Sequence, residues 1–333
     1  MNSISEDKQL PKSKLSVNRK AWSLAEKLCD SSEEYGVIVK ETSHGVTLID
    51  AGILAKGNLE AGKIITEICL GGFGEAKISS TKYDNLTLPS IFVSTDYPAI
   101  STLGSQFADW QIKAGDYSAI GSGPARALAR KNRQLYEKIG YKDEANVAVL
   151  VLETTREPPV SVIEQVCREC GVKPNKLMLI LVPTTCIAGS TQVSGRIVET
   201  GLHKLMKLGL DPKLALHASG SAPIAPMHPK FAEAMGRTND AILYMGEASY
   251  DIGGYRDDEK LRKIVEKAPS STSPNYGRPF LQIFKEANYD FYKIDPNLFA
   301  PAVVTVNNIE TGSVFKAGKI NVAVFKQSIG LNT

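Results

Sequence analysis

Residues 177–207 of this chain read LMLILVPTTCIAGSTQVSGRIVETGLHKLMK. The apolar run at 177–182 predicts a buried strand, and the segment after it predicts an amphipathic helix. Arg196 and Glu199 are three residues apart and therefore share one face of that helix. A carboxylate beside a guanidinium, close to the end of a buried strand, is a candidate acid–base site.

The same face also has a structural interpretation. At about 100° per residue, Gln192, Arg196, Glu199 and His203 lie opposite the apolar residues of the helix. By pattern alone this face is solvated, and an exposed Arg–Glu pair stabilises a helix by only about 0.3 kcal/mol. The catalytic interpretation requires the polar face to line a cleft, and the pattern leaves both interpretations open.

Composition limits the class of protein. The chain has 333 residues, of which 43% are hydrophobic and 23% charged, as in ordinary globular proteins. This length favours two domains around a cleft. The net charge is only +3, and basic residues are mixed with acidic ones, so we expect no nucleic-acid partner. This small positive charge is compatible with a mildly basic cleft for an anionic small molecule.

Targeting and domain signals are few. Residues 1–14 are polar, lack the apolar core of a signal peptide, and are expected to form a disordered extension. The apolar runs at 147–152 and 177–182 are far too short to cross a bilayer, so we expect a cytoplasmic protein with no membrane partner. Pro158 and Pro159 mark a break. We expect a first domain at 15–156 and a second at 157–333, whose C-terminal segment could pack back on the first.

Helical and strand patterns intermingle along the chain without strict alternation, which predicts an α+β fold. The expected helices lie at 17–29, 59–70, 100–108 and 161–170, with one ending at 135–140 and another starting at Ser190. The expected strands form a hairpin over 36–51 and lie at 75–79, 90–94, 145–152, 177–182, 241–245 and 301–306.

Cysteine and histidine patterns do not predict a metal centre. Five cysteines, an odd number in a long chain, argue against a disulfide framework. Cys167 and Cys170 have the spacing of a redox or zinc motif, but no second pair of ligands accompanies them. The four histidines show no metal-ligand spacing, so we expect no transition metal.

The segment GSGPARAL at 121–128 is a candidate anion site. Its glycines allow close backbone approach, Pro124 suits a first helical position, and free N–H groups at a helix start attract anions. The glycine spacing fits neither a phosphate loop nor a dinucleotide fingerprint. Ser122, Gly123 and Arg126 are the candidate ligands, and a simple capped turn is the structural alternative.

Three other polar segments are weaker candidates. Thr95 and Asp96 follow an expected strand, where ligands often bind. Residues 219–226 form a Gly/Pro loop of the kind that lines pockets, and Asn239 and Asp240 precede the strand expected at 241–245. A plain turn is the alternative for each.

Five separated segments, in this order, resemble the methenyltetrahydromethanopterin cyclohydrolase family. The similarity extends from about 17 to 330. The segments are GSGPARAL (121–128), GRIVET (195–200), APIAP (222–226), TND (238–240) and FKEANYDF (284–291).

This resemblance implies an enzyme of one-carbon metabolism that interconverts the methenyltetrahydromethanopterin cation and the N5-formyl compound. It implies two α+β domains side by side around a deep pocket, a homo-oligomer (often a trimer), and chemistry without a metal or organic cofactor. By resemblance, Glu199 is the residue that accepts the proton of the attacking water. Arg196 would hold Glu199 in place, favour its charged form and stabilise the oxygen of the tetrahedral adduct.

The other site assignments are hypotheses that follow from the substrate. Its tail carries a phosphate and carboxylates, for which Ser122, Gly123 and Arg126 are candidates. Its pterin ring needs donors and acceptors, for which the candidates are Thr95, Asp96, Asn239 and Asp240. The chain departs from some relatives at Phe107, where they carry a lysine.

Three alternatives stay open at this point. The first is a related one-carbon enzyme acting on a folate-type carrier, which differs only in specificity. The second is a catalytically silent pterin-binding or regulatory protein, although both Arg196 and Glu199 are present. The third is a nucleotide enzyme built on residues 121–126.

Overall fold

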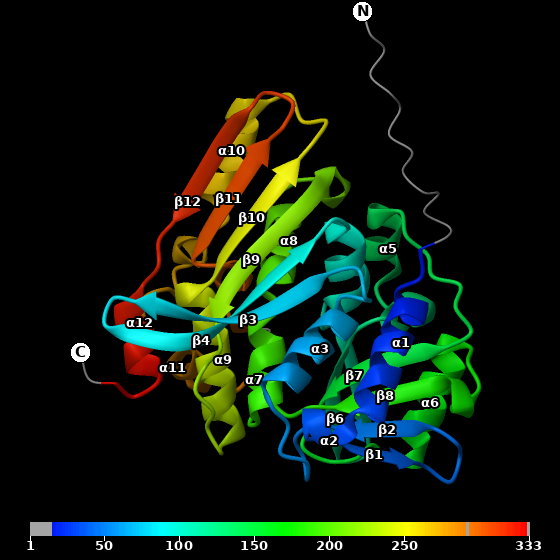
Figure 1. Ribbon diagram of the computed structural model, residues 1–333. Helices are drawn as coiled ribbons and strands as arrows, with labels where there is room; N and C mark the ends of the chain where they lie inside the picture. Colours follow the sequence, from blue (N-terminus) through cyan, green and yellow to red (C-terminus); the bar gives the residue numbers. More distant parts are fainter. Residues whose placement is uncertain (1–14, 291–292, 332–333) are drawn as a thin grey trace, which may run out of the picture.

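The computed structural model describes residues 15–290 and 293–331, and its helices and strands are labelled in Figure 1. The disorder expected for residues 1–14 lies outside the described residues. The helices are α1 (Val17–Asp30), α2 (Ser32–Tyr35), α3 (Leu59–Cys69), the π-helix η2 (Ala99–Gln106), α4 (Ala125–Ala129), α5 (Arg133–Ile139), α6 (Val160–Cys170), α7 (Ile187–Ser194), α8 (Ile197–Lys207), α9 (Phe231–Met245), α10 (Asp258–Glu266), α11 (Phe280–Glu286) and α12 (Val322–Ser328). The strands are β1 (Ile38–Glu41), β2 (Thr47–Asp50), β3 (Glu75–Tyr83), β4 (Leu86–Thr95), β5 (Trp110–Ala114), β6 (Tyr117–Ser122), β7 (Ala148–Glu153), β8 (Leu177–Leu181), β9 (Ala215–Pro223), β10 (Glu247–Ile252), β11 (Val303–Asn308) and β12 (Ser313–Gly318).

The first sheet has the strand order β1-β2-β8-β7-β6-β5. Its central strands β2, β8 and β7 run parallel, and antiparallel strands flank them on both sides. Val149 and Val151 of β7 pack with α1 and α3, whereas Leu150 and Leu152 pack with α6. Helices therefore bury both faces, which explains why β7 and β8 read as continuous apolar runs.

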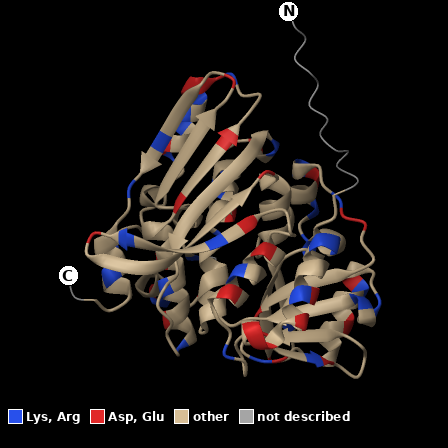
Figure 2. Cartoon of the chain, in the orientation of Figure 1, with Lys and Arg blue, Asp and Glu red and all other residues tan. Residues whose placement is uncertain are grey.

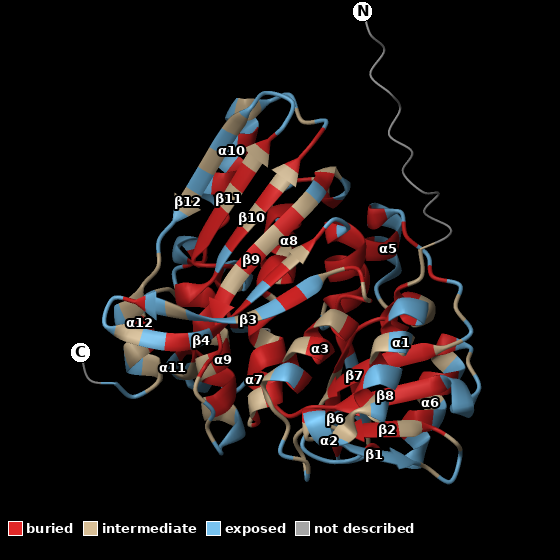
Figure 3. Ribbon diagram, in the orientation of Figure 1, coloured by how far each residue is buried: buried red, intermediate tan, exposed pale blue. Residues whose placement is uncertain are grey.

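The second sheet has the strand order β12-β11-β10-β9-β4-β3 and is antiparallel except for the pair β10–β11. Helices α8 and α10 pack on one face, where they bury Tyr250 and Val306. Exposed side chains such as Phe92 and Val314 leave part of this sheet in contact with solvent, as the pale segments in Figure 3 show. Helices α9, α11 and α12 form a separate apolar cluster with Tyr83 and Leu88. The α+β fold with two sheets is confirmed.

The chain passes between the two sheets more than once. Strands β3 and β4 precede residue 156 but belong to the second sheet, and β8 follows it but belongs to the first. A cut at residue 156 therefore does not separate the two sheets. The Pro158–Pro159 break marks only the entry into α6.

Two secondary-structure predictions are wrong. Residues 241–245, predicted as a strand, form the last part of the helix α9. Their side chains are buried on all sides, and a short run of five apolar residues reads alike in a buried strand and a buried helix. Residues 219–223, predicted as part of a loop, are the end of strand β9.

The helix predicted after β8 is interrupted at Gly195, so that α7 and α8 are separate helices. A Cβ atom at Gly195 would lie 2.4 Å from Cγ2 of Thr66 in α3. The close approach of α3 therefore requires glycine at the junction. Because α8 starts anew there, Arg196 becomes its N-cap residue and Glu199 lies in its first turn.

Charges of both signs are spread over the elements in Figure 2, in agreement with the mixed charge pattern of the sequence. No helix among the described residues is long and apolar enough to span a bilayer.

Helices α3 and α7 pack closely through Gly62, and this contact generates the first prediction. A Cβ at Gly62 would lie 2.4 Å from Cβ of Thr191 and 2.8 Å from the carbonyl oxygen of Ala188. We expect Gly62→Ala to lower the free energy of unfolding by about 1–3 kcal/mol, measured by urea denaturation, because the two helices must move apart.

Gly236→Ala in α9 is the matched control. The nearest atom to its Cβ would be Cβ of Leu281 at 3.0 Å. The gain in helix propensity from glycine to alanine, roughly 1 kcal/mol, offsets the free-energy cost of this contact. Equal effects of the two substitutions would contradict close packing at Gly62.

Candidate active site

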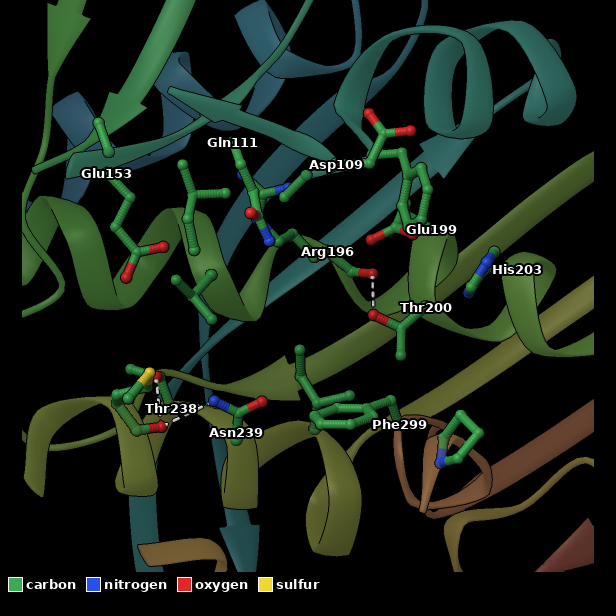
Figure 4. A pocket seen from close by; sticks show the side chains of 18 of the residues that line it. Asp109, Gln111, Glu153, Arg196, Glu199, Thr200, His203, Thr238, Asn239 and Phe299 are labelled. Atoms are coloured by element: carbon green, nitrogen blue, oxygen red, sulfur yellow. Dashed lines mark hydrogen bonds between the residues drawn. The ribbon is translucent and has the colours of Figure 1, made fainter. Parts of the chain in front are cut away.

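A cavity of about 750 Å³ lies between the edge of the first sheet and helices α8 and α9. One wall comes from β5, β6 and the end of β7, and the other comes from α8, α9 and the segments before and after η7 (Pro296–Leu298). Figure 4 shows the labelled side chains that line it. Its polar lining residues are Asp109, Gln111, Lys113, Ser118, Glu153, Arg196, Glu199, Thr200, His203, Thr238, Asn239, Tyr289 and Asp290.

Glu199 lines this cavity and is only 6% exposed. Its carboxylate makes no hydrogen bond or ion pair with the described residues 15–290 and 293–331. Burial raises the pKa of Glu199 to about 7, Arg196 and Arg126 act against this rise, and Asp109 adds to it. Burial disproves the solvated-face interpretation of the helix. An uncommitted carboxylate with a pKa near neutrality can accept and return a proton.

Arg196 lies beside Glu199 but is not paired with it. Its Nη1 donates to the carbonyl oxygen of Gln106 (2.6 Å), and its Nη2 donates to Ser122 Oγ (2.8 Å) and Gln192 Oε1 (3.0 Å). The expectation that Arg196 holds Glu199 directly is therefore wrong for this structure. Three acceptors fix the guanidinium, which acts on Glu199 only as a nearby positive charge.

Arg126 is fully buried and belongs to an internal network. Its guanidinium forms an ion pair with Asp109 at 2.5 Å and donates to the carbonyl oxygens of Leu103 (3.3 Å) and Ser105 (3.2 Å). Neither Ser122 nor Gly123 lines the cavity, since the Ser122 hydroxyl accepts from Arg196 and the Gly123 N–H donates to Ser105. The GSGPARAL segment thus packs behind the cavity wall, where Ser122 and Arg126 bond to residues of that wall.

Thr95 and Asp96 do not line the cavity. Thr95 Oγ1 donates to the carbonyl oxygen of Phe73 at 2.6 Å, which makes it a buried turn residue. Asp96 is exposed and pairs with His217 at 2.8 Å. Thr95 is the last residue of strand β4 and Asp96 follows it, but that strand ends away from the cavity.

Asn239 and Asp240 lie on helix α9 and point in different directions. Asn239 lines the cavity together with Thr238, and its amide donates to the carbonyl oxygen of Met235 at 2.9 Å (Figure 4). Asp240 is fully buried and accepts from the Phe280 N–H at 2.9 Å and from Ser328 Oγ. Burial raises the pKa of Asp240 to about 8. Its partners make it a link between α9 and its neighbours α11 and α12.

Several cavity residues were missed by the sequence reasoning. Phe107 and His203 pack together, with ring centroids 4.6 Å apart. Burial lowers the pKa of His203 to about 4, so this ring is neutral at physiological pH. Asp109 and Glu153 bring two further carboxyl groups to the lining. His203 already belongs to the polar face defined from the sequence, one turn after Glu199, but no role was predicted for it.

The structure contains no group of three or more His, Cys, Asp or Glu within the described residues that could hold a metal ion. Cys167 and Cys170 are both buried on helix α6, where they pack in the core under the first sheet. Their spacing thus reflects the apolar face of a helix.

The family model described as "Cyclohydrolase (MCH)" matches residues 16–329. A methenyltetrahydromethanopterin cyclohydrolase of Methanocaldococcus jannaschii is 44% identical over 95% of this chain and 98% of its own length. Enzymes with the same name from Methanothermobacter marburgensis and Methanococcoides burtonii are 43% and 40% identical, over 95% of this chain and 100% and 99% of their own lengths.

The raised pKa of Glu199 generates a prediction about stability. A carboxyl group whose pKa is raised on folding contributes most stability below its unfolded value of 4.5, and this contribution is lost as the pH rises through about 7. Glu199→Gln removes the titration. We expect the melting temperature of Glu199→Gln to exceed that of the wild type at pH 8.5 by about 2 °C or more, with a smaller difference at pH 5.

Glu144→Gln is the control, because Glu144 is exposed and forms a surface ion pair with Lys142. Its melting temperature should track that of the wild type across the same pH range. A wild type that gains stability over Glu199→Gln as the pH rises would show that the folded chain favours the charged form.

Proposed function

This chain belongs to the methenyltetrahydromethanopterin cyclohydrolase family, and we infer that it is a hydrolase of one-carbon metabolism. Its reaction is the reversible hydrolysis of the 5,10-methenyltetrahydromethanopterin cation to the N5-formyl compound. One observation supports a site for this reaction above all others. Glu199 is a buried carboxylate, without a hydrogen-bond partner among the described residues, in the wall of a cavity.

The chemistry needs a group that moves protons. The carbon between N5 and N10 of the substrate is already cationic and electrophilic, so water can attack it once a base takes a proton. Ionised Glu199 would accept that proton as the C–O bond forms. Protonated Glu199 would then deliver it to N10 as the C–N10 bond breaks. The proton of the new hydroxyl is lost as the formyl C=O forms, so that one proton is released overall.

Arg196 would assist by its charge and its fixed position. Its three acceptors hold the guanidinium in one orientation without consuming the Glu199 carboxylate. A fixed positive charge keeps part of the Glu199 population ionised near neutral pH, although burial opposes ionisation. It also favours the developing negative charge on the attacking oxygen.

The walls of the cavity suit a planar ring. Phe107 with His203, and Phe299 on the other side, offer aromatic faces, and Asn239 offers an amide for polar edges of a pterin. By the family resemblance Phe107 stands where some relatives carry a lysine, and here its ring packs against His203. We propose that Asn239 and the Phe107–His203 pair contact the ring.

Three further properties are proposals that rest on the family. We propose that the reaction needs no metal or organic cofactor, because the carbon that water attacks is already cationic. We also propose that the chain works in the cytoplasm as a homo-oligomer, with a trimer favoured. Light scattering of the purified protein would refute the oligomer if it gave the mass of one chain.

The decisive kinetic comparison is between the wild type and Glu199→Gln. The absorbance of methenyltetrahydromethanopterin should decay rapidly with the wild type and about 10²–10⁴-fold more slowly with Glu199→Gln, because the amide cannot accept the proton. Binding of the substrate to the variant, measured by calorimetry, should persist. Dialysis against EDTA should leave the wild-type rate unchanged.

Methenyltetrahydrofolate, assayed in parallel, tests the alternative carrier, and faster decay of that compound would favour a folate-type enzyme. Glu144→Gln is again the control and should keep the wild-type rate. A wild type that binds the substrate but does not accelerate its decay would make a silent pterin-binding protein the better interpretation.

A further inference from the structure

Asp109 forms a second charged centre beside Glu199. Its Oδ1 accepts from Arg126 Nε at 2.5 Å and lies 2.5 Å from Arg126 Nη2. Arg126 is completely buried, whereas the Asp109 side chain is 17% exposed and lines the cavity. Figure 4 shows Asp109 next to Glu199. The pair therefore connects the cavity with a buried cation behind it.

This ion pair is tied to the segment that holds Arg196. Arg126 donates to the carbonyl oxygens of Leu103 and Ser105 in the π-helix η2. Gln106, the next residue, accepts from Arg196 and donates through its amide to the carbonyl oxygen of Gly195 at 3.0 Å. Arg126 and Arg196 are thus anchored to the same short segment, residues 103–106.

The groups that face Glu199 come from several elements. Arg196 at the start of α8 and Arg126 of α4 are cations, and Asp109, just before β5, is the anion that compensates Arg126. Tyr250 of β10 donates its hydroxyl to the carbonyl oxygen of Val198, and His203 of α8 is neutral near pH 7. Without Asp109, two uncompensated guanidiniums would act on a single buried carboxylate.

We propose that Asp109 is a positioning residue for the hydrolysis, which neutralises Arg126 and thereby keeps Glu199 basic enough to take the proton of the attacking water. The proposal rests on the proposed function and assigns a role that acts through another residue. Asp109 also brings a carboxyl group to the wall of a cavity that must admit a cation. Two effects follow from its loss: a less basic Glu199 and a less favourable site for the cationic substrate.

The test is the pH profile of kcat/KM for methenyltetrahydromethanopterin, which reports the titration of the free enzyme. In the wild type, kcat/KM should fall at low pH as Glu199 becomes protonated, and this part of the profile is its acid limb. In Asp109→Asn the limb should move to lower pH by about one unit, because removal of a nearby negative charge favours ionised Glu199. The rate on the plateau above this limb should fall several-fold, since a weaker base accepts a proton less readily.

Two companion variants separate charge from structure. Asp109→Glu keeps the charge and should return the limb to its wild-type position. The double variant Asp109→Asn/Arg126→Met removes both charges and should place the limb at or slightly above the wild-type position. Replacement of a buried ion pair by uncharged side chains is often tolerated, so the double variant also serves if Asp109→Asn alone does not fold.

Asp116→Asn is the matched control, because Asp116 lies in the turn of the β5–β6 hairpin, exposed and paired with Arg156. It should leave the acid limb in place. An unmoved limb in folded Asp109→Asn, or an equal loss of rate in Asp109→Glu, would reduce Asp109 to a structural residue and overturn the proposal. An inactive wild type would instead refute the proposed function. In that case, infrared titration of the Glu199 carboxyl, identified by its loss in Glu199→Gln, still tests Asp109.

Discussion

Burial of one carboxyl group, without a hydrogen-bond partner among residues 15–290 and 293–331, is the constraint on which this site depends. A buried carboxylate is expensive unless nearby charge compensates it, and Glu199 receives compensation at a distance. Direct pairing with Arg196 would lower the pKa of Glu199 and would use its carboxylate oxygens as hydrogen-bond acceptors. The structure avoids this by giving the guanidinium three other acceptors, so that Glu199 remains available to a substrate.

That arrangement depends on the break between α7 and α8. A continuous helix would place Arg196 in a helix interior, whereas the interruption at Gly195 places it at an N-cap, from which it reaches the end of η2 and strand β6. The close approach of α3 explains the glycine, since Thr66 leaves no room for a side chain at Gly195, and glycine weakens a helix at this position. Packing in the first layer of helices therefore determines the geometry of a cavity on the other side of α7.

The sequence predicted the elements whose patterns are strong. The runs of β7 and β8, the amphipathic helices α1 and α3 and the Arg196–Glu199 face could all be found in it. The direction of that face could not be predicted, because a polar stripe looks the same toward solvent and toward a cavity. Arg126 and Asp240 illustrate the limit most clearly. Both are charged residues that local patterns place near a ligand, yet tertiary partners far along the chain bury them completely. The strand predicted at 241–245, which is part of α9, was wrong for a related reason. Burial on all sides removes the periodicity that distinguishes a helix from a strand.

The interleaved strand order also has a consequence for synthesis on the ribosome. Strand β4 pairs with β9, but β5, β6, β7 and β8 of the other sheet all leave the ribosome before β9 does. The β3–β4 hairpin packs on earlier parts of the chain such as α3, but it lacks its third strand until β9 has emerged. Its open edge could pair with strands of neighbouring nascent chains during that interval.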